Sequence, residues 1–86
     1  MEFEITFTGS AEKDFKSIPK EFVEKILSII EERIAENPYV AGKKLKGQWR
    51  GMYSYHVANY RIVYQIFPKD QSIAILRIKP RGRVYR

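Results

Sequence analysis

The sequence predicts a small α+β fold in the order β-α-α-β-β-β, with an antiparallel-rich four-stranded sheet and an N-terminal helical hairpin on one face. Three observations predict it. Residues 2–7 alternate polar and apolar side chains, residues 20–34 place apolar side chains at helical spacing, and residues 52–79 are rich in β-branched and aromatic residues. With 86 residues, we expect one domain spanning residues 1–86.

The first strand and the first helix follow from the N-terminal pattern. The apolar residues on one face of the strand are Phe3, Ile5 and Phe7. The strand is interrupted at residues 8–10, and Ser10 is predicted to cap a short helix because serine is a common N-cap. The positions of that helix predicted to face the core are Ala11, Phe15 and Ile18.

The second helix is predicted to begin at Pro19, which suits a first helical position, and to end at Asn37-Pro38. Its apolar stripe comprises Phe22, Val23, Ile26, Leu27, Ile30 and Ile34. A stripe of this kind is far more often core than a ligand site, so we interpret it as structural.

The C-terminal half contains the remaining strands. Residues 38–51 are predicted to be a loop, because Pro38, Gly42, Gly47 and Gly51 punctuate a basic stretch. Strands are expected at residues 52–57, 60–67 and 72–79, with a turn at residues 68–71. The first strand is expected beside the last and parallel to it, because the helical hairpin allows that return.

Charge is divided unevenly along the chain. Residues 1–42 carry five Lys/Arg and nine Asp/Glu, a net charge of −4, whereas residues 43–86 carry eleven Lys/Arg and one acid, a net charge of +10. The strong positive charge of residues 43–86 favours binding to a nucleic-acid phosphate backbone or to an acidic protein. The alternative interpretation is a charged surface that only keeps the protein soluble.

Composition also excludes several kinds of site. The absence of cysteine rules out disulfides, thiolate zinc sites and cysteine nucleophiles, and one histidine cannot form a multi-histidine metal site. We therefore expect no metal site. The N-terminus lacks the apolar run of a signal peptide, and no apolar run is long enough to span a bilayer, so a cytoplasmic location without membrane contact is expected.

The only histidine is predicted to lie beside an arginine. If Ala58-Asn59 is a two-residue hairpin turn, in which Asn tolerates the positive φ required, counting back pairs His56 with Arg61 across two strands. The other predicted pairs are Val57 with Tyr60, Tyr55 with Ile62, Ser54 with Val63, and Tyr53 with Tyr64. Adjacent basic groups repel, so such a pair favours an anion between them, and Arg61 should lower the pKa of His56 and favour its neutral form. The alternative is a solvent-facing pair without function.

The predicted tail adds further cations and a tyrosine, namely Arg81, Arg83, Tyr85 and Arg86. Arginine recognises phosphate through its planar fork, and tyrosine stacks on exposed bases. A flexible basic end is the alternative interpretation.

At this point three motifs together resemble the RelE/ParE toxin superfamily. They are L-x-G at residues 45–47, Y-R-x-x-Y at residues 60–64 and R-x-R-x-Y at residues 81–85, and the ending 76–86 is especially similar to archaeal RelE toxins. The resemblance implies a RelE-like fold and a toxin of a type II toxin–antitoxin system, neutralised by a cognate RelB-like antitoxin. RelE members cleave messenger RNA in the ribosomal A site by attack of a 2′-OH on the adjacent phosphate, which implies ribosome and mRNA as partners and needs no metal or cofactor.

The resemblance also implies catalytic roles for four residues of this chain. Arg61 matches the arginine that stabilises the transition state, Arg81 the arginine near the leaving group, and Tyr85 the tyrosine that stacks on the nucleotide. His56 stands where bacterial RelE toxins have a basic residue proposed as general base. Ser54 stands where they have another cation, which Lys43, Lys46 or Arg50 could replace. The expected RNA-binding cations are Lys43, Lys44, Lys46, Arg50, Lys79, Arg83 and Arg86.

Two other functions remain open at the level of sequence. A ParE-like toxin would share the fold and poison DNA gyrase by binding alone, and a non-catalytic module would bind RNA through the basic face and the tyrosines.

Overall fold

The computed structural model describes residues 2–80, which form three helical segments and five strands. The helices are α1 (Gly9–Lys16), α2 (Lys20–Ile29), which continues into a π-helical turn (Ile30–Ile34), and α3 (Pro38–Ala41). The strands are β1 (Glu4–Phe7), β2 (Lys43–Lys44), β3 (Met52–Val57), β4 (Tyr60–Phe67) and β5 (Ser72–Pro80). Short 3-10 turns occupy Gly47–Trp49 and Pro68–Asp70. Within residues 2–80, no helix has the length and apolar character needed to cross a membrane.

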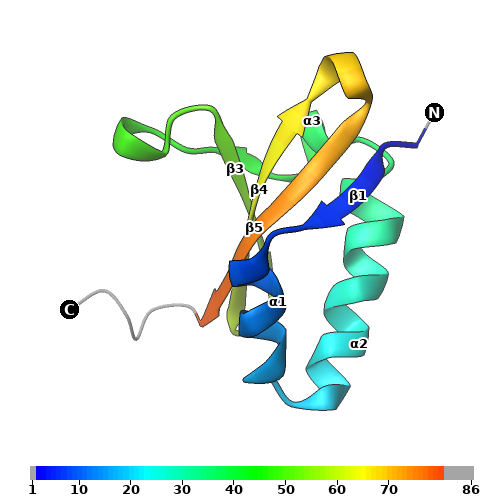
Figure 1. The fold of residues 1–86 in the computed structure, drawn as a ribbon, viewed down its shortest axis with the longest axis vertical. Coiled ribbons are helices and arrows are strands. Elements are labelled where there is room, and N and C mark those ends of the chain that lie inside the picture. The colour runs from blue at the N-terminus through cyan, green and yellow to red at the C-terminus, as the bar shows by residue number, and fades with distance from the viewer. Residues whose placement is uncertain (1, 81–86) are drawn as a thin grey trace.

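The five strands form one mixed sheet in the order β1-β5-β4-β3-β2. The prediction that the first strand lies parallel beside the last is confirmed, with Glu4–Phe7 paired to Ser72–Ile75 (Figure 1). The prediction of four strands is wrong. Lys43 and Lys44 form a fifth, edge strand against β3, and residues 38–51 therefore are not a simple loop. Two lysines carry little strand propensity of their own, and pairing with β3 imposes the extended conformation.

Helices α1 and α2 pack against the same face of the sheet (Figure 1). The predicted inward residues Ala11, Ile26, Ile30 and Ile34 are fully or almost fully buried there, together with the alternating inward side chains of β4 and β5. The opposite face of the sheet, turned away from α1 and α2, is called the outer face below.

Two predicted helix boundaries differ from the structure. Thr8 rather than Ser10 caps α1: its hydroxyl oxygen accepts a hydrogen bond from the Ala11 backbone N–H at 3.1 Å. Thr8 is selected because the same hydroxyl also donates to the Leu76 carbonyl at 2.9 Å, a tertiary contact that Ser10 does not make. Pro19 precedes α2 as its N-cap, instead of being its first residue.

The predicted register of the β3–β4 hairpin is confirmed in full. All five predicted pairs occur, from Val57 with Tyr60 to Tyr53 with Tyr64. The turn conformation differs in one respect, because the residue with positive φ is Ala58, at 53°, and not the predicted Asn59. The register depends on the two-residue length of the turn, which is why it survives this difference.

Candidate functional site

Three basic side chains lie in a row across neighbouring strands on the outer face. His56 on β3 is the direct partner of Arg61 on β4, and Arg61 is the direct partner of Lys79 on β5. Directly paired residues point to the same face of a sheet, and Ile62 and Ile78, the neighbours of Arg61 and Lys79, are buried on the helix side. The row His56–Arg61–Lys79 (called the basic row below) thus concentrates positive charge on the outer face near the hairpin turn.

The first pair of this row is in hydrogen-bond contact. The Arg61 Nε–H donates to His56 Nε2 across 3.4 Å, at the long end of the accepted range. A hydrogen bond in this direction uses the lone pair of Nε2. A phosphate oxygen accepts hydrogen bonds from arginine more strongly than an imidazole nitrogen does, so a phosphate bound here would compete with His56 for the Arg61 guanidinium.

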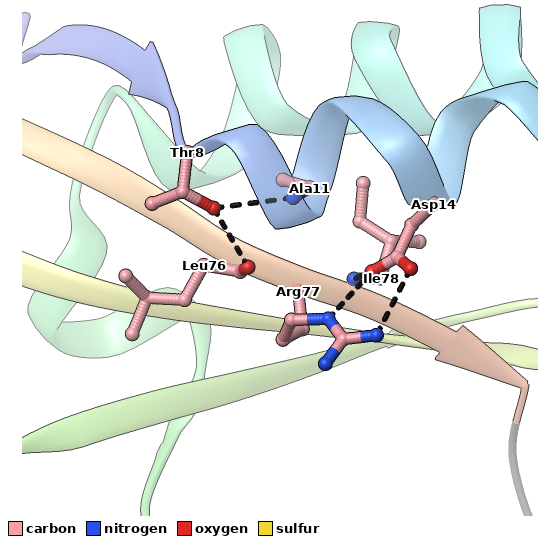
Figure 2. A network of polar contacts seen from close by, with 6 residues as sticks. All are labelled: Thr8, Ala11, Asp14, Leu76, Arg77 and Ile78. Atoms are coloured by element: carbon pink, nitrogen blue, oxygen red, sulfur yellow. Dashed lines mark hydrogen bonds and ion pairs between the residues drawn. The ribbon is translucent and has the colours of Figure 1, made fainter.

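Helix α1 fixes the strand that carries Lys79. β1 pairs with β5 only as far as Ile75. Beyond that residue, side chains of α1 and of its N-cap hydrogen-bond to the edge of β5 that β1 leaves unpaired (Figure 2). Thr8 binds the Leu76 carbonyl, and an Asp14 carboxylate oxygen accepts from the Ile78 backbone N–H at 2.8 Å. Asp14 also forms a two-pronged ion pair with Arg77, at 2.9 and 3.1 Å. We call the contacts of Asp14 with Arg77 and Ile78 the Asp14 clamp.

Electrostatics of the Asp14 clamp favour the ionised carboxylate. Burial alone raises the pKa of Asp14, but the hydrogen bonds from Arg77 and from the Ile78 backbone, with the charges of Arg77 and Lys79, outweigh it. The net pKa lies below the ordinary value of 3.8. The hydrogen bond to Asp14 in turn raises the pKa of Arg77. Arg77 is therefore engaged in a structural pair, whereas Lys79, two residues further along the same strand, faces the same side as Arg61.

The predicted basic loop supplies cations at other points of the sheet. Ser54, where a cation was expected, is 8% exposed on β3, and its direct partner on the edge strand is Lys43. Lys44, Lys46 and Arg50 are exposed, and they lie toward the end of the sheet remote from the hairpin turn. The structure thus brings Lys43 and Lys79 to strands flanking the His56–Arg61 pair, and separates Lys44, Lys46 and Arg50 from it.

Four predicted site residues, Arg81, Arg83, Tyr85 and Arg86, lie outside the described residues. Among residues 2–80, no group of three or more His, Cys, Asp or Glu side chains is placed to hold a metal ion.

Comparison with known proteins identifies the family. Residues 5–85 match the model of the ParE toxin of type II toxin–antitoxin systems. The chain belongs to the RelE/ParE toxin superfamily. It is accordingly a toxin of the type II toxin–antitoxin class.

Named relatives of this toxin are of the RelE type. Toxin RelG of Mycobacterium tuberculosis is 26% identical over 100% of this chain and 99% of the relative, and toxin RelE of the same organism is 25% identical over 98% and 87%. The archaeal RelE–RelB complex from Pyrococcus horikoshii contains a chain 29% identical, with a TM-score of 0.72 over 98% of this chain and 100% of that one. The RelBE2 complex of M. tuberculosis shares the fold, with a TM-score of 0.89 at 23% identity over 94% and 93%.

Sequence reasoning missed Asp14 and the alignment of Lys79 with Arg61 in this toxin. Asp14 is one of nine acids in the N-terminal half, and its contacts span more than 60 positions, so no local pattern distinguishes it. The Arg61–Lys79 pairing depends on an irregularity between Val63 and Tyr64, which shifts the β4–β5 register by one residue. Counting from the turn at residues 68–71 without that bulge would have placed Arg61 opposite a different residue.

Proposed function

We propose that this toxin is a metal-independent endoribonuclease that cleaves messenger RNA on the ribosome, with the basic row at its centre. The observation that carries the proposal is the direct alignment of His56, Arg61 and Lys79 on the outer face. Arg61 and Lys79 are like charges in direct cross-strand contact, which destabilises a sheet, so an anionic ligand that binds across the row explains the arrangement best. RelE-type relatives support RNA as that anion.

In the proposed reaction, His56 acts as the base, and Arg61 and Lys79 stabilise charge. His56 Nε2 takes the proton of the ribose 2′-OH, whose oxygen forms a bond to the adjacent phosphorus. The bond from phosphorus to the 5′-oxygen then breaks, and that oxygen takes a proton from water, with the Arg81 guanidinium proposed beside it to stabilise its negative charge. Arg61 and Lys79 stabilise the additional negative charge of the five-coordinate phosphorus. Tyr85 is proposed to stack on the nucleotide.

Lys79 and Lys43 explain how the toxin tolerates serine at position 54. Each lies on a strand next to the His56–Arg61 hairpin, Lys79 as the partner of Arg61 and Lys43 as the partner of Ser54. A long lysine side chain on an adjacent strand reaches the same phosphate region that a cation at position 54 would occupy. Lys79 is the stronger candidate because it belongs to the basic row itself.

The proposed partners are the ribosome with its mRNA and a RelB-like antitoxin. Both solved relatives described above are toxin–antitoxin complexes. An acidic antitoxin segment would be attracted to the C-terminal half, whose net charge is +10.

Cleavage of A-site mRNA on purified ribosomes tests the proposal. The wild-type toxin should cleave, and the Arg61→Ala/Arg81→Ala double variant should be slower by at least about 100-fold, because two charge-stabilising groups are lost. Lys69→Ala is the matched control, since Lys69 is an exposed cation in the turn Pro68–Asp70 at the far end of β4. Equal cleavage by the wild type and the double variant would refute the assignment.

A gyrase-binding function is the second candidate, because the matching family model is that of the ParE toxin. Inhibition of DNA supercoiling by the wild type, without any mRNA cleavage, would select it in place of the nuclease.

A further inference from the structure

Three surface cavities of the described residues differ in charge. Two of them, one between β1 and α2 and one beside α3, are lined by carboxylates, which are Glu2, Glu31, Glu32 and Glu36. The second of these also contains Arg33. The third, of about 380 Å³, lies between α3 and the start of β3 and is lined by Lys44 and Arg50 with no carboxylate. No acid occurs between Glu36 and Asp70 in the sequence, so this cavity alone of the three is complementary to a phosphate.

An exposed aromatic ring forms one wall of the third cavity. Tyr39 on α3 lines it and is 49% exposed. Its ring makes edge contacts with Phe3 at 6.2 Å and Tyr53 at 6.4 Å between centroids, so it is held from two sides. A fixed and half-exposed ring beside two cations is the arrangement that binds an unpaired nucleobase and its phosphate.

Both cationic residues stand on hydrogen-bonded backbone. Lys44 pairs with Tyr53 across β2 and β3, and the Leu45 N–H donates to the Met52 carbonyl at 2.9 Å. Arg50 ends a 3-10 turn in which its N–H donates to the Gly47 carbonyl at 3.0 Å. These cations therefore stand on ordered backbone, which lowers the entropy lost when a ligand binds.

The third cavity is separate from the basic row. Tyr53, which lines it, points to the helix side of the sheet, whereas His56 points to the outer face. The two sites are also about 10 Å apart along β3, three residues at strand spacing. One nucleotide cannot contact both sites, so a nucleotide in the third cavity is not the one whose phosphate is cleaved.

We propose that the third cavity is a second RNA site that holds one unpaired nucleotide of ribosomal RNA, its base against Tyr39 and its phosphate between Lys44 and Arg50. The choice of ribosomal RNA rests on the proposed function, in which the ribosome is the partner and the mRNA lies on the outer face. The site anchors the toxin on the ribosome and takes no part in cleavage.

Binding of the toxin to purified ribosomes without mRNA tests the proposal. Tyr39→Leu, which keeps an apolar side chain but removes the aromatic ring, should weaken binding about 5- to 150-fold, the loss expected for one stacked base. Tyr39→Phe should bind like the wild type, as should Val40→Ala, a control on the same helix whose side chain does not line the third cavity. Lys44→Gln and Arg50→Gln should each lower the slope of log affinity against log salt by about 0.7.

A second arm uses a short 2′-O-methylated RNA oligonucleotide, which cannot be cleaved through its 2′ oxygen. Trp49 is the only tryptophan, is exposed and precedes Arg50, so its fluorescence reports binding beside the third cavity. Quenching should persist in Arg61→Ala and be lost in Tyr39→Leu. Loss in Arg61→Ala with retention in Tyr39→Leu would overturn the second site.

The outcomes separate this proposal from that of the nuclease. A toxin that binds ribosomes through Tyr39 but cleaves no mRNA would retain the second site and refute the nuclease. Ribosome binding that is insensitive to Tyr39, Lys44 and Arg50 would overturn the second site while leaving the nuclease intact. If Tyr39→Leu instead weakens only the binding of an acidic antitoxin peptide, the third cavity is a protein contact and the proposal is wrong.

Discussion

Replacement of Asp14 by alanine should destabilise the toxin, because it removes the acceptor that holds the end of β5. The Ile78 N–H would lose its acceptor at a residue that is only 2% exposed, and an unsatisfied buried N–H costs about 1–3 kcal/mol. The ion pair itself adds at most about 1 kcal/mol, because the Arg77 side chain is 38% exposed. The higher helix propensity of alanine offsets roughly 0.5 kcal/mol of this loss, so we expect a net loss of about 0.5–3.5 kcal/mol, centred near 2 kcal/mol.

Urea unfolding followed by circular dichroism measures this loss. Asp14→Asn should lose about 1 kcal/mol only, since its amide oxygen still accepts from Ile78 while the charge is gone. Lys13→Ala, an exposed neighbour on the same helix, should stay within about 0.5 kcal/mol of the wild type. If Asp14→Ala were as mild as Lys13→Ala, the Asp14 clamp would not hold the end of β5.

Acid titration gives an independent check on the same residue. The pKa of Asp14 is lowered in the folded state, so its contribution is fully present above the unfolded value near 3.8 and is lost as the pH falls through the folded pKa. The stability difference between the wild type and Asp14→Asn should therefore shrink below about pH 4. A difference that stays constant down to pH 2 would contradict the lowered pKa.

Three further predictions concern the β3–β4 region and α3. Gly42→Ala should cost about 1–3 kcal/mol, because a Cβ there would lie 2.5 Å from the Tyr64 hydroxyl, whereas Gly9→Ala, with nothing within 4 Å, should be close to neutral in the same unfolding assay. Burial raises the pKa of Tyr64 to about 12, so stability should fall as the pH rises from about 10 through 12, and Tyr64→Phe should remove that fall; an unchanged alkaline profile would contradict it. Ala58→Gly should leave stability unchanged or raise it by up to about 1 kcal/mol, because φ is 53° at Ala58, and a clear loss would show that this turn conformation is not the one in solution.

The elements of the fold that could be predicted are those whose structure follows from residues close together in the sequence. Alternation and β-branched content predicted β3 and β4 with their observed ends, and a two-residue turn was enough to pair His56 with Arg61. Strand β2 does not follow from such residues, because two lysines become a strand only through pairing with β3. The π-helical turn at Ile30–Ile34 likewise carries no sequence signal, since its apolar spacing is also that of a continuous α-helix.

The part of the candidate site that could be predicted is also the part formed by residues close together in the sequence. His56 and Arg61 are five residues apart, so the hairpin alone brings them together. Lys79 joins them only through a bulged β4–β5 register, and Asp14 reaches β5 from another layer of the fold. Contacts that depend on tertiary packing are not encoded in any short pattern. The contacts of Asp14 and the Arg61–Lys79 pairing were missed for this reason, while the His56–Arg61 pair was found.

The chemical identity of the 3′ end of cleaved mRNA tests the central claim most directly. Attack by the 2′-OH leaves a 2′,3′-cyclic phosphate at that end, which mass spectrometry distinguishes from a 3′-hydroxyl. The basic row predicts a cyclic phosphate with the wild-type toxin on ribosomes and no product from mRNA carrying a 2′-deoxy sugar at the cleaved position. A 3′-hydroxyl end, or undiminished cleavage of the deoxy substrate, would contradict the mechanism.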